Sequence, residues 1–266
     1  MVVADLPSPL TMSGDNPAPT GQYDGLDAHS LAARWGVPFV VAYDTTVSTL
    51  DDAHRLARNG APHGTLVVAD QQTGGRGRHG KQWHSARGQG IWLTLLARDL
   101  DAATVGVLAI RLGLAVAGPL DRFAPRPVQL KWPNDVYLAG GKLAGILVET
   151  RWQGALASWA AIGVGINVGS AGARSAGGAA LRGGTERLDV LDAVVPAIVG
   201  AVSERGSLSE AELSAFASRD LAAGLACTSP CAGRVLGLAA DGGLRVETVR
   251  GVRTMHAGSL VLTNNA

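Results

Sequence analysis

The strongest chemical signal in the sequence is the segment Gly75-Arg76-Gly77-Arg78-His79-Gly80, in which glycines alternate with basic residues. Glycines let backbone N–H groups approach a ligand closely, and such groups bind anions when arginines stand nearby. Lys81 and Arg87 follow and add positive charge. The segment predicts a loop that binds a phosphate or a carboxylate. A solvated basic surface turn is the alternative.

The same glycines satisfy a different pattern, the G-x-G-x-x-G fingerprint of dinucleotide-binding folds, with Gly75, Gly77 and Gly80. In those folds the glycines lead directly into a helix whose N-terminus meets the pyrophosphate. Residues 81–90 are instead rich in loop-forming residues and predict no helix. The sequence therefore argues against a nicotinamide-cofactor site.

A second polar cluster, Lys131-Trp132-Pro133-Asn134-Asp135, follows a predicted strand, and Lys142 comes shortly after it. Pro133 keeps the preceding residue extended and ends the strand, so Asn134 and Asp135 should lie at the rim of a sheet. Polar groups at a strand end suit a binding site. An Asn-Asp pair that only caps its own backbone in a turn is the alternative.

Apolar periodicity indicates the elements that must position these clusters. It predicts strands at 38–43, 65–69, 91–97, 128–132, 143–151 and 155–167, and helices at 29–35, 48 to about 60, 104–123, 188–204 and 209–222. The stretch 71–90 has no such pattern, and so long a loop is usually functional. A small-residue loop is predicted at 170–184.

Composition divides the chain into three parts. Residues 1–27, rich in Pro, Gly, Asp and Ser, predict a disordered leader, and 28–225 predict a catalytic domain with a mixed β-sheet flanked by helices. Residues 226–266 contain short alternating segments separated by glycines, which predict a small SH3-like β-barrel. The predicted fold class is thus α/β (α+β) with a β appendage.

Overall composition excludes several classes of protein. The chain has 266 residues, of which 47% are hydrophobic, so it does not need disulfides to hold its core. A net charge of +1 gives no global field that would gather DNA or an anionic membrane. Cys227 and Cys231 have no second Cys or His pair nearby, so a zinc site would lack ligands.

Membrane insertion and secretion are also disfavoured. The most lipid-like stretch, Val105 to Leu120, is interrupted by Arg111 and Pro119, and a buried core helix is the better interpretation. Met1 to Leu10 lack the basic start and continuous apolar run of a secretory signal. A cytoplasmic enzyme is therefore expected.

Together, the two clusters resemble the catalytic domain of biotin protein ligases. The family pattern includes Gly-Arg-Gly-Arg, Lys-Trp-Pro-Asn-Asp and the segment Lys142 to Leu147. Further matches are Ser48-Thr49, Gln72-Thr73, Trp83, Gly163 to Asn167 and His256 to Leu260, so the resemblance runs from about residue 38 to the end. It implies an enzyme that makes biotinyl-5′-AMP and pyrophosphate from biotin and ATP, and then transfers biotin to a lysine of a biotin carboxyl carrier domain.

The resemblance also implies roles for individual residues. It assigns catalysis to Lys142, Arg76, Arg78 and Asp135; biotin binding to Ser48, Thr49, Gln72, Gly75, Arg76, Gly77, Arg78, Lys142 and Gly145; and adenylate binding to Arg78, Trp83, Lys131, Asn134, Lys142 and Asn167. Mg²⁺ would enter with ATP, and its ligands stay open. Trp83 would stack on adenine, with a core position as the alternative, and Trp92 is expected to be buried or to form a wall of the biotin pocket.

Arg76 and Arg78 are expected to neutralise the biotin carboxylate and the α-phosphate, which must meet in the first step. Asp135 is expected to accept a hydrogen bond from the acceptor lysine. The loop around Gly75 has few apolar anchors, so it is predicted to be mobile until biotin orders it.

Two other functions remain to be weighed. A lipoate or octanoate ligase would share the architecture, but those enzymes are not marked by the two motifs. A biotin-sensing DNA-binding repressor would need an additional winged helix, and residues 1–37 are too short and too poor in apolar periodicity to hold one. No nucleic-acid or membrane partner is expected. The oligomeric state and the acceptor carboxylases stay open.

Overall fold

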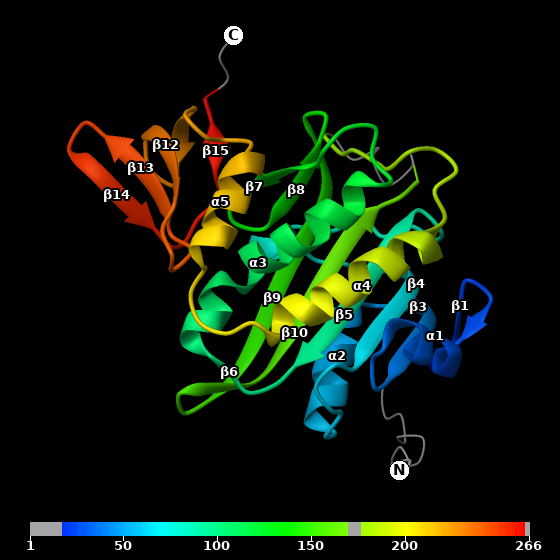
Figure 1. Cartoon of the computed structure of the whole chain (residues 1–266). Helices are drawn as coiled ribbons and strands as arrows, with labels where there is room; N and C mark the ends of the chain where they lie inside the picture. The colour runs from blue at the N-terminus through cyan, green and yellow to red at the C-terminus, as the bar shows by residue number, and fades with distance from the viewer. Residues whose placement is uncertain (1–17, 170–176, 264–266) are drawn as a thin grey trace.

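The computed structural model describes residues 18–169 and 177–263. Residues 1–17 of the predicted leader, 170–176 of the predicted small-residue loop and 264–266 lie outside the described residues. The remaining chain forms a large mixed sheet with helices on both faces and a smaller antiparallel sheet at one end (Figure 1).

The large sheet has the strand order β3-β4-β5-β10-β9-β8-β7, with the short β6 paired to β10. The strands are β3 (Val40–Thr46), β4 (Leu66–Gln72), β5 (Gly90–Ala97), β6 (Leu100–Asp101), β7 (Gln129–Lys131), β8 (Asp135–Leu138), β9 (Gly141–Gln153) and β10 (Leu156–Asn167). β3 and β4 are parallel and the other neighbours antiparallel. We call the connection between β4 and β5, residues 73–89, the glycine–arginine loop.

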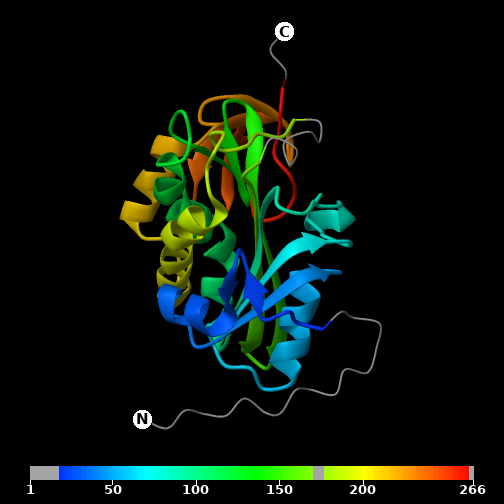
Figure 2. The same cartoon turned by 90° about the vertical axis from the view of Figure 1, so that its right-hand side faces the viewer.

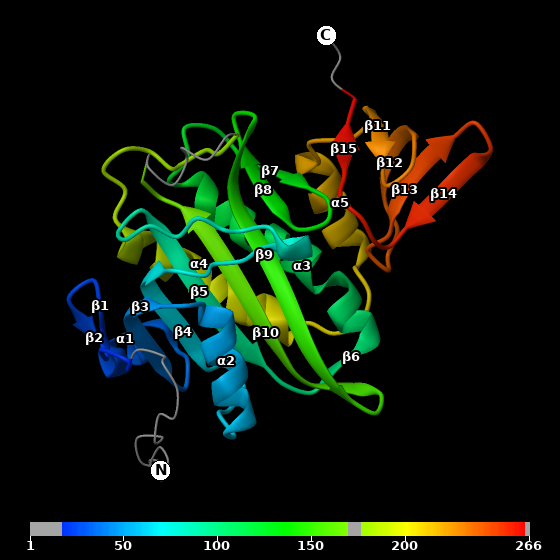
Figure 3. The ribbon, with the colours of Figure 1, turned by 180° about the vertical axis from the view of Figure 1, so that it is seen from behind.

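Helices cover the two faces of this sheet unequally. α1 (Ala28–Trp35), α3 (Ala102–Asp121) and α4 (Arg187–Ser203) pack on one face, whereas α2 (Thr49–Arg58) lies on the other (Figures 2 and 3). The first face carries the main core, and beneath α2 there is a small second cluster that includes Tyr43, Leu50 and Val67. Because α2 is short, it leaves part of its face open for a binding site.

α3 is long and apolar enough to span a membrane by length and composition alone. In the structure it is a core helix: Leu108, Leu112 and Val116 are fully buried in the main hydrophobic cluster. Arg111, which interrupts its apolar run, is buried too, and its Nε donates to Glu212 Oε1 (2.6 Å) on α5 (Glu210–Arg219). The expectation of a buried core helix is confirmed.

The C-terminal sheet has the order β14-β13-β12-β11-β15. Its strands are β11 (Ala226–Ser229), β12 (Gly233–Leu238), β13 (Leu244–Thr248), β14 (Gly251–Met255) and β15 (Val261–Leu262). Val235 and Leu244 belong to the same apolar cluster as the helices of the large domain, and Trp132 Nε1 donates to the carbonyl of Gly242 (3.0 Å). The predicted fold class is confirmed. The boundary at 225/226 stays a prediction.

The expectation of a disordered leader is wrong for residues 20–27. β1 (Gln22–Tyr23) and β2 (Leu26–Asp27) form a hairpin, and Tyr23 is 3% exposed. The backbone N–H groups of Thr20 and Gly21 both donate to the carbonyl of Ala42, on the outer strand β3. The sequence did not predict this hairpin because its residues are mostly polar, and a single buried aromatic side chain, Tyr23, anchors it.

Three further strands, β6, β8 and β11, were not predicted either. β6 has two residues, and β8 and β11 have four each. β8 starts directly after the turn at Pro133, so Lys131 and Asp135 face each other as neighbours across a hairpin. The glycine–arginine loop has no long element, as expected, and contains only the 3₁₀ turn η1 (Arg78–Gly80).

Candidate active site

A cavity of ≈ 640 Å³ lies on the sheet face that α2 leaves open. Thirteen of the fourteen site residues expected from the sequence line it: Ser48, Thr49, Gln72, Arg76, Gly77, Arg78, Trp83, Lys131, Asn134, Asp135, Lys142, Gly145 and Asn167. They come from α2, from the glycine–arginine loop and from strands on both sides of the sheet. The structure therefore brings the two sequence clusters together around one space.

Gly75 is the expected site residue that does not line the cavity. A Cβ at this position would lie 2.5 Å from the carbonyl oxygen of Trp83 and 2.6 Å from Ser85 Oγ. The Gly75 carbonyl also accepts a hydrogen bond from the backbone N–H of Trp83 (2.8 Å). Gly75 thus lets the two sides of the loop approach each other, and its role is in the loop's shape.

One end of the cavity is uncharged and polar. Gln72 Oε1 accepts from the backbone N–H (2.9 Å) and the hydroxyl (3.1 Å) of Thr49, and Gln72 Nε2 donates to Ser85 Oγ (2.8 Å). Ser48 Oγ and Trp92 Nε1 are buried without a hydrogen-bond partner among the described residues. Since buried polar groups without partners are costly, this end suits a ligand that both donates and accepts hydrogen bonds.

Ser48 occupies the N-cap position of α2 by its backbone, but its side chain makes no capping hydrogen bond. The hydroxyl is thereby left available to the cavity that Ser48 lines.

The floor of the cavity is made of glycines. Gly145 on β9 and Gly165 on β10 are direct partners in the sheet register. A Cβ at Gly165 would lie 2.6 Å from Trp83 Nε1, and one at Gly145 would lie 3.1 Å from Trp83 Cζ3. The glycine pair therefore makes the seat on which the indole of Trp83 lies.

Trp83 and Trp92 lie edge to face, with ring centroids 6.4 Å apart. Trp92 is 1% exposed and lines the cavity, so it is both buried and part of a wall. The ammonium of Lys142 lies 5.2 Å from the centroid of the Trp83 ring. Trp83 thus lies between the uncharged and the charged parts of the site.

The other end of the cavity carries excess positive charge. Lys142 Nζ pairs with Asp135 Oδ1 at 2.6 Å, and Arg78 donates to Asn134 Oδ1 (3.1 Å) and to the carbonyl of Gly258 (2.8 Å). Burial lowers the pKa of Lys131, whose ammonium lies over the Tyr137 ring. Among the described lining residues Asp135 is the only carboxylate. This end suits an anion with more than one negative charge.

Arg76 does not supply a free cation to this end. Its Nε and Nη2 each donate to one oxygen of Glu149 (3.0 Å), and its Nη1 donates to Asp51 Oδ2 (2.9 Å). The two carboxylates outweigh the one guanidinium charge. Of the two arginines in the motif, Arg78 is therefore the one whose hydrogen bonds go to uncharged groups.

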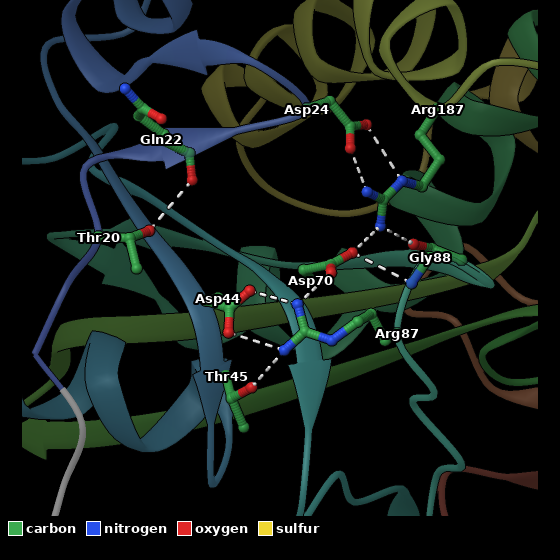
Figure 4. Close-up of polar contacts among 10 residues, drawn as sticks. Thr20, Gln22, Asp24, Asp44, Thr45, Asp70, Arg87, Gly88 and Arg187 are labelled. Atoms are coloured by element: carbon green, nitrogen blue, oxygen red, sulfur yellow. Dashed lines mark hydrogen bonds and ion pairs between the residues drawn. The ribbon is translucent and has the colours of Figure 1, made fainter.

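Arg87, expected to add to the positive charge of the loop, also pairs with protein carboxylates. Its guanidinium donates to Asp44 and to Asp70 (2.9 Å), and Asp70 additionally accepts from Arg187, which reaches Asp24 as well (Figure 4). None of these five residues lines the cavity. Arg87 fastens the C-terminal end of the loop to β3 and β4.

Asn167, expected to contact the base of a nucleotide, is 5% exposed at the cavity wall. Its Nδ2 donates to the carbonyls of Lys142 (3.3 Å) and Ala179 (3.1 Å). In this structure it thus holds two backbone segments beside the charged end, and the contact with a base stays a prediction.

Sequence reasoning missed several residues around the site. The backbone at 259–261 brings the C-terminal sheet to the cavity, and Tyr137 lies beside Lys131. Glu149 was missed because nothing near it in sequence forms a motif. The available signal was its spacing on β9. Glu149 comes two residues after Leu147 and four after Gly145, and alternate residues of a strand point to the same face of the sheet.

Among residues 18–169 and 177–263 there is no group of three or more His, Cys, Asp or Glu side chains that could hold a metal ion. Cys227 and Cys231 are free thiols, and Cys227 Sγ contacts the carbonyl of Cys231 (3.3 Å).

Comparison with known proteins finds a family match in the central part of the chain. Residues 43–167 match the model of the biotin/lipoate A/B protein ligase family. The bifunctional ligase/repressor BirA of Bacillus subtilis is 41% identical over 130 residues, which make up 48% of this chain and 40% of that protein. The biotin–[acetyl-CoA-carboxylase] ligase of Mycobacterium tuberculosis is 40% identical over 129 residues, 46% of this chain and 47% of that protein. The chain thus matches less than half the length of these two relatives.

A solved structure extends the similarity beyond this region. The biotin protein ligase of Aquifex aeolicus, in complex with biotin and ATP, superposes with a TM-score of 0.71 at 26% identity, and covers 84% of this chain and 98% of its own. This match agrees with the resemblance inferred from the two sequence motifs.

Proposed function

We propose that this chain, whose residues 43–167 match the model of the biotin/lipoate A/B protein ligase family, is an ATP-dependent ligase that attaches biotin to a lysine of a biotin carboxyl carrier domain. The observation that carries the proposal is the cavity itself. One end of the cavity is uncharged and has buried polar groups without hydrogen-bond partners among the described residues, and the other end has excess positive charge. A floor of paired glycines, Gly145 and Gly165, connects the two ends.

Biotin fits this arrangement when its ureido ring occupies the uncharged end. A ureido group has a carbonyl acceptor and two N–H donors, and Ser48, Thr49 and Gln72 supply hydroxyl and amide groups of both kinds. Gly145 lets Trp83 and the ammonium of Lys142 lie close to the cavity floor, beside the proposed path of the rest of the molecule. The valeryl carboxylate then points to Lys142 and Arg78.

In the first step an oxygen of the biotin carboxylate attacks the α-phosphorus of ATP, and pyrophosphate leaves. Two anions must approach each other, so the cations at this end lower the barrier by holding both in place. Each charge-assisted hydrogen bond from Lys142 or Arg78 contributes about 1.5–3 kcal/mol. Lys131 and Asn134 stand beside them for the phosphates, and Trp83 and Asn167 are proposed to bind the adenine.

In the second step the amine of the acceptor lysine attacks the acyl carbon of biotinyl-5′-AMP. An amide bond forms, the bond from the acyl carbon to the phosphate oxygen breaks, and AMP leaves. The attacking amine must lose a proton. We propose Asp135, whose Oδ1 lies 2.6 Å from Lys142 Nζ, as the group that accepts a hydrogen bond from this amine.

Mg²⁺ would enter as Mg-ATP and would neutralise charge on the polyphosphate. Mg²⁺ sites of this kind are usually built from substrate phosphates with one or two carboxylates. Asp135 and the amide of Asn134 are the oxygen donors at the charged end that fit such a role.

The direct test is to incubate the purified protein with biotin, ATP and Mg²⁺ and a biotin carboxyl carrier domain, and to follow the mass of the carrier. We expect one biotinyl group on one lysine, and no addition when lipoate replaces biotin. A carrier that stays unmodified across a range of magnesium concentrations would refute the proposal.

The cytoplasm, which holds ATP and acyl-CoA carboxylases, is the proposed location.

A further inference from the structure

A chain of partly buried hydrogen bonds lies beside the cavity and ends on Arg76, which lines it. Glu149 accepts two hydrogen bonds from Arg76, and on its other side Glu149 Oε2 lies 2.9 Å from His54 Nε2. His54 Nδ1 accepts from Trp159 Nε1 at 2.9 Å. His54, Glu149 and Trp159 do not line the cavity, so they reach a ligand only through Arg76.

The direction of each hydrogen bond in this chain is fixed. An indole N–H only donates, so His54 Nδ1 must be the acceptor and the ring proton lies on Nε2. That N–H then donates to Glu149, which as a carboxylate only accepts. These bonds and Arg76 lower the pKa of Glu149 to about 2. Glu149 is therefore ionised, and His54 holds its carboxylate from the side opposite Arg76.

The other three residues of this hydrogen-bond chain lie on regular helices and strands, whereas Arg76 lies in a loop. His54 is 4% exposed on α2, and Glu149 and Trp159 lie on the long strands β9 and β10. Asp51, the second carboxylate that holds Arg76, lies one turn before His54 on α2. Arg76 belongs to the glycine–arginine loop, where its backbone forms a bridge to Gln82, and two residues earlier the N–H of Gly74 donates to the carbonyl of Val47 (2.8 Å).

We propose that Trp159, His54 and Glu149 form a positioning relay that fixes Arg76, and with it the glycine–arginine loop, over the cavity. Arg76 is the anchor of the loop, and the relay places Arg78 and Trp83, farther along the same loop, toward the ligand. The inference rests on the proposed function for its kinetic readout. It departs from the expectation that Arg76 neutralises the ligand itself.

The test compares Glu149→Gln, Arg76→Gln and the double variant. The matched controls Glu247→Gln and Arg253→Gln change exposed residues of the C-terminal sheet. In the unliganded protein, amide exchange of residues 74–83 should quicken about tenfold in each single variant, which is the usual size of one charge-assisted hydrogen bond. For adenylate formation, the KM for biotin should rise by a similar factor, with kcat within about twofold.

The double variant should be no worse than the poorer single variant, because the two changes cut the same connection. His54→Ala should loosen the loop, and His54→Gln should restore most of the protection, since an amide N–H can replace the Nε2–H donor to Glu149. Thermal unfolding checks that each variant is folded. If Glu149→Gln does not fold, Arg76→Gln tests the connection from the loop. His54→Ala and His54→Gln then test it from α2.

Additive losses in the double variant would overturn the relay, as would unchanged exchange in residues 74–83. A large fall in kcat at unchanged KM for Arg76→Gln would instead make Arg76 a catalytic cation. The exchange measurement needs no activity. If the wild-type protein does not activate biotin, the proposed function fails while the relay is still decided.

Discussion

At the scale of single residues, the site depends on what each charged side chain is paired with. Arg76 and Arg78 stand two positions apart in one motif, yet Arg76 is held by two carboxylates and Arg78 by an amide and a backbone carbonyl. The sequence predicted both as ligand cations because a motif gives residue types. The partners come from α2 and β9, and only the fold brings them near.

Lys142 and Asp135 should separate the two half-reactions. Lys142→Ala should slow adenylate formation about a hundredfold, because it removes a charge-assisted contact to both reacting anions. Asp135→Asn should slow transfer to the carrier more than adenylate formation, since its proposed partner is the acceptor amine. Pyrophosphate release and single-turnover transfer from preformed adenylate measure the two steps. Equal losses of both steps in Asp135→Asn would contradict the assignment.

Glu149 should leave a mark on acid stability. A carboxyl group whose pKa is lowered by folding stabilises the native state above its unfolded pKa and loses that effect as pH falls through its folded pKa. For Glu149 the window runs from 4.5 down to about 2. Across it, the free energy of unfolding should fall less steeply in Glu149→Gln than in wild type, as followed by urea denaturation. The exposed Glu247→Gln should keep the wild-type slope, and a Glu149→Gln slope equal to it would contradict the shift.

At the scale of elements, the paired strands β9 and β10 build the floor by register. Periodicity predicted both strands nearly to their ends, but it could not predict that Gly145 and Gly165 are opposite each other. The motif resemblance named Gly145 for the site. The partner glycine and the indole resting on both follow from the pairing.

Gly165→Ala tests this seat. The added methyl would lie 2.6 Å from the indole of Trp83, so either the ring or the strand must move. We expect a loss of about 1–3 kcal/mol in the free energy of unfolding and a higher KM for ATP, because overpacking displaces Trp83. Gly200→Ala is the matched control. Nothing lies within 4 Å of its new methyl, in the interior of α4, so it should stabilise the protein slightly. Similar behaviour of the two variants would show that Trp83 has no fixed seat.

At the scale of the whole molecule, the two sheets are not independent. The composition predicted a change of architecture near residue 226, and β11 begins there. It did not predict the shared core, in which Val235 and Leu244 belong to the same apolar cluster as α3 and α4. Alternation of apolar and polar residues shows that one face of a strand is buried, but it does not show which element covers that face.

We therefore expect the full chain to unfold in one cooperative transition. Trp132 on the large domain bonds to Gly242, and Arg78 bonds to Gly258, so loss of either sheet exposes apolar surface and unpaired polar groups of the other. Scanning calorimetry should give one peak whose calorimetric and van't Hoff enthalpies agree. Two resolved peaks would mean that the C-terminal sheet is a separate folding unit.

The contribution of residues 259–261 to the cavity has a consequence for synthesis of the protein. A ribosome makes the chain from its N-terminus, so the segments that carry Ser48, Gln72 and Lys142 emerge long before residues 259–261 do. The nascent chain can fold most of its large sheet, but its active site lacks one wall until residues 259–261 have left the ribosome. Biotin and ATP then meet a complete site only after the C-terminal sheet has been made.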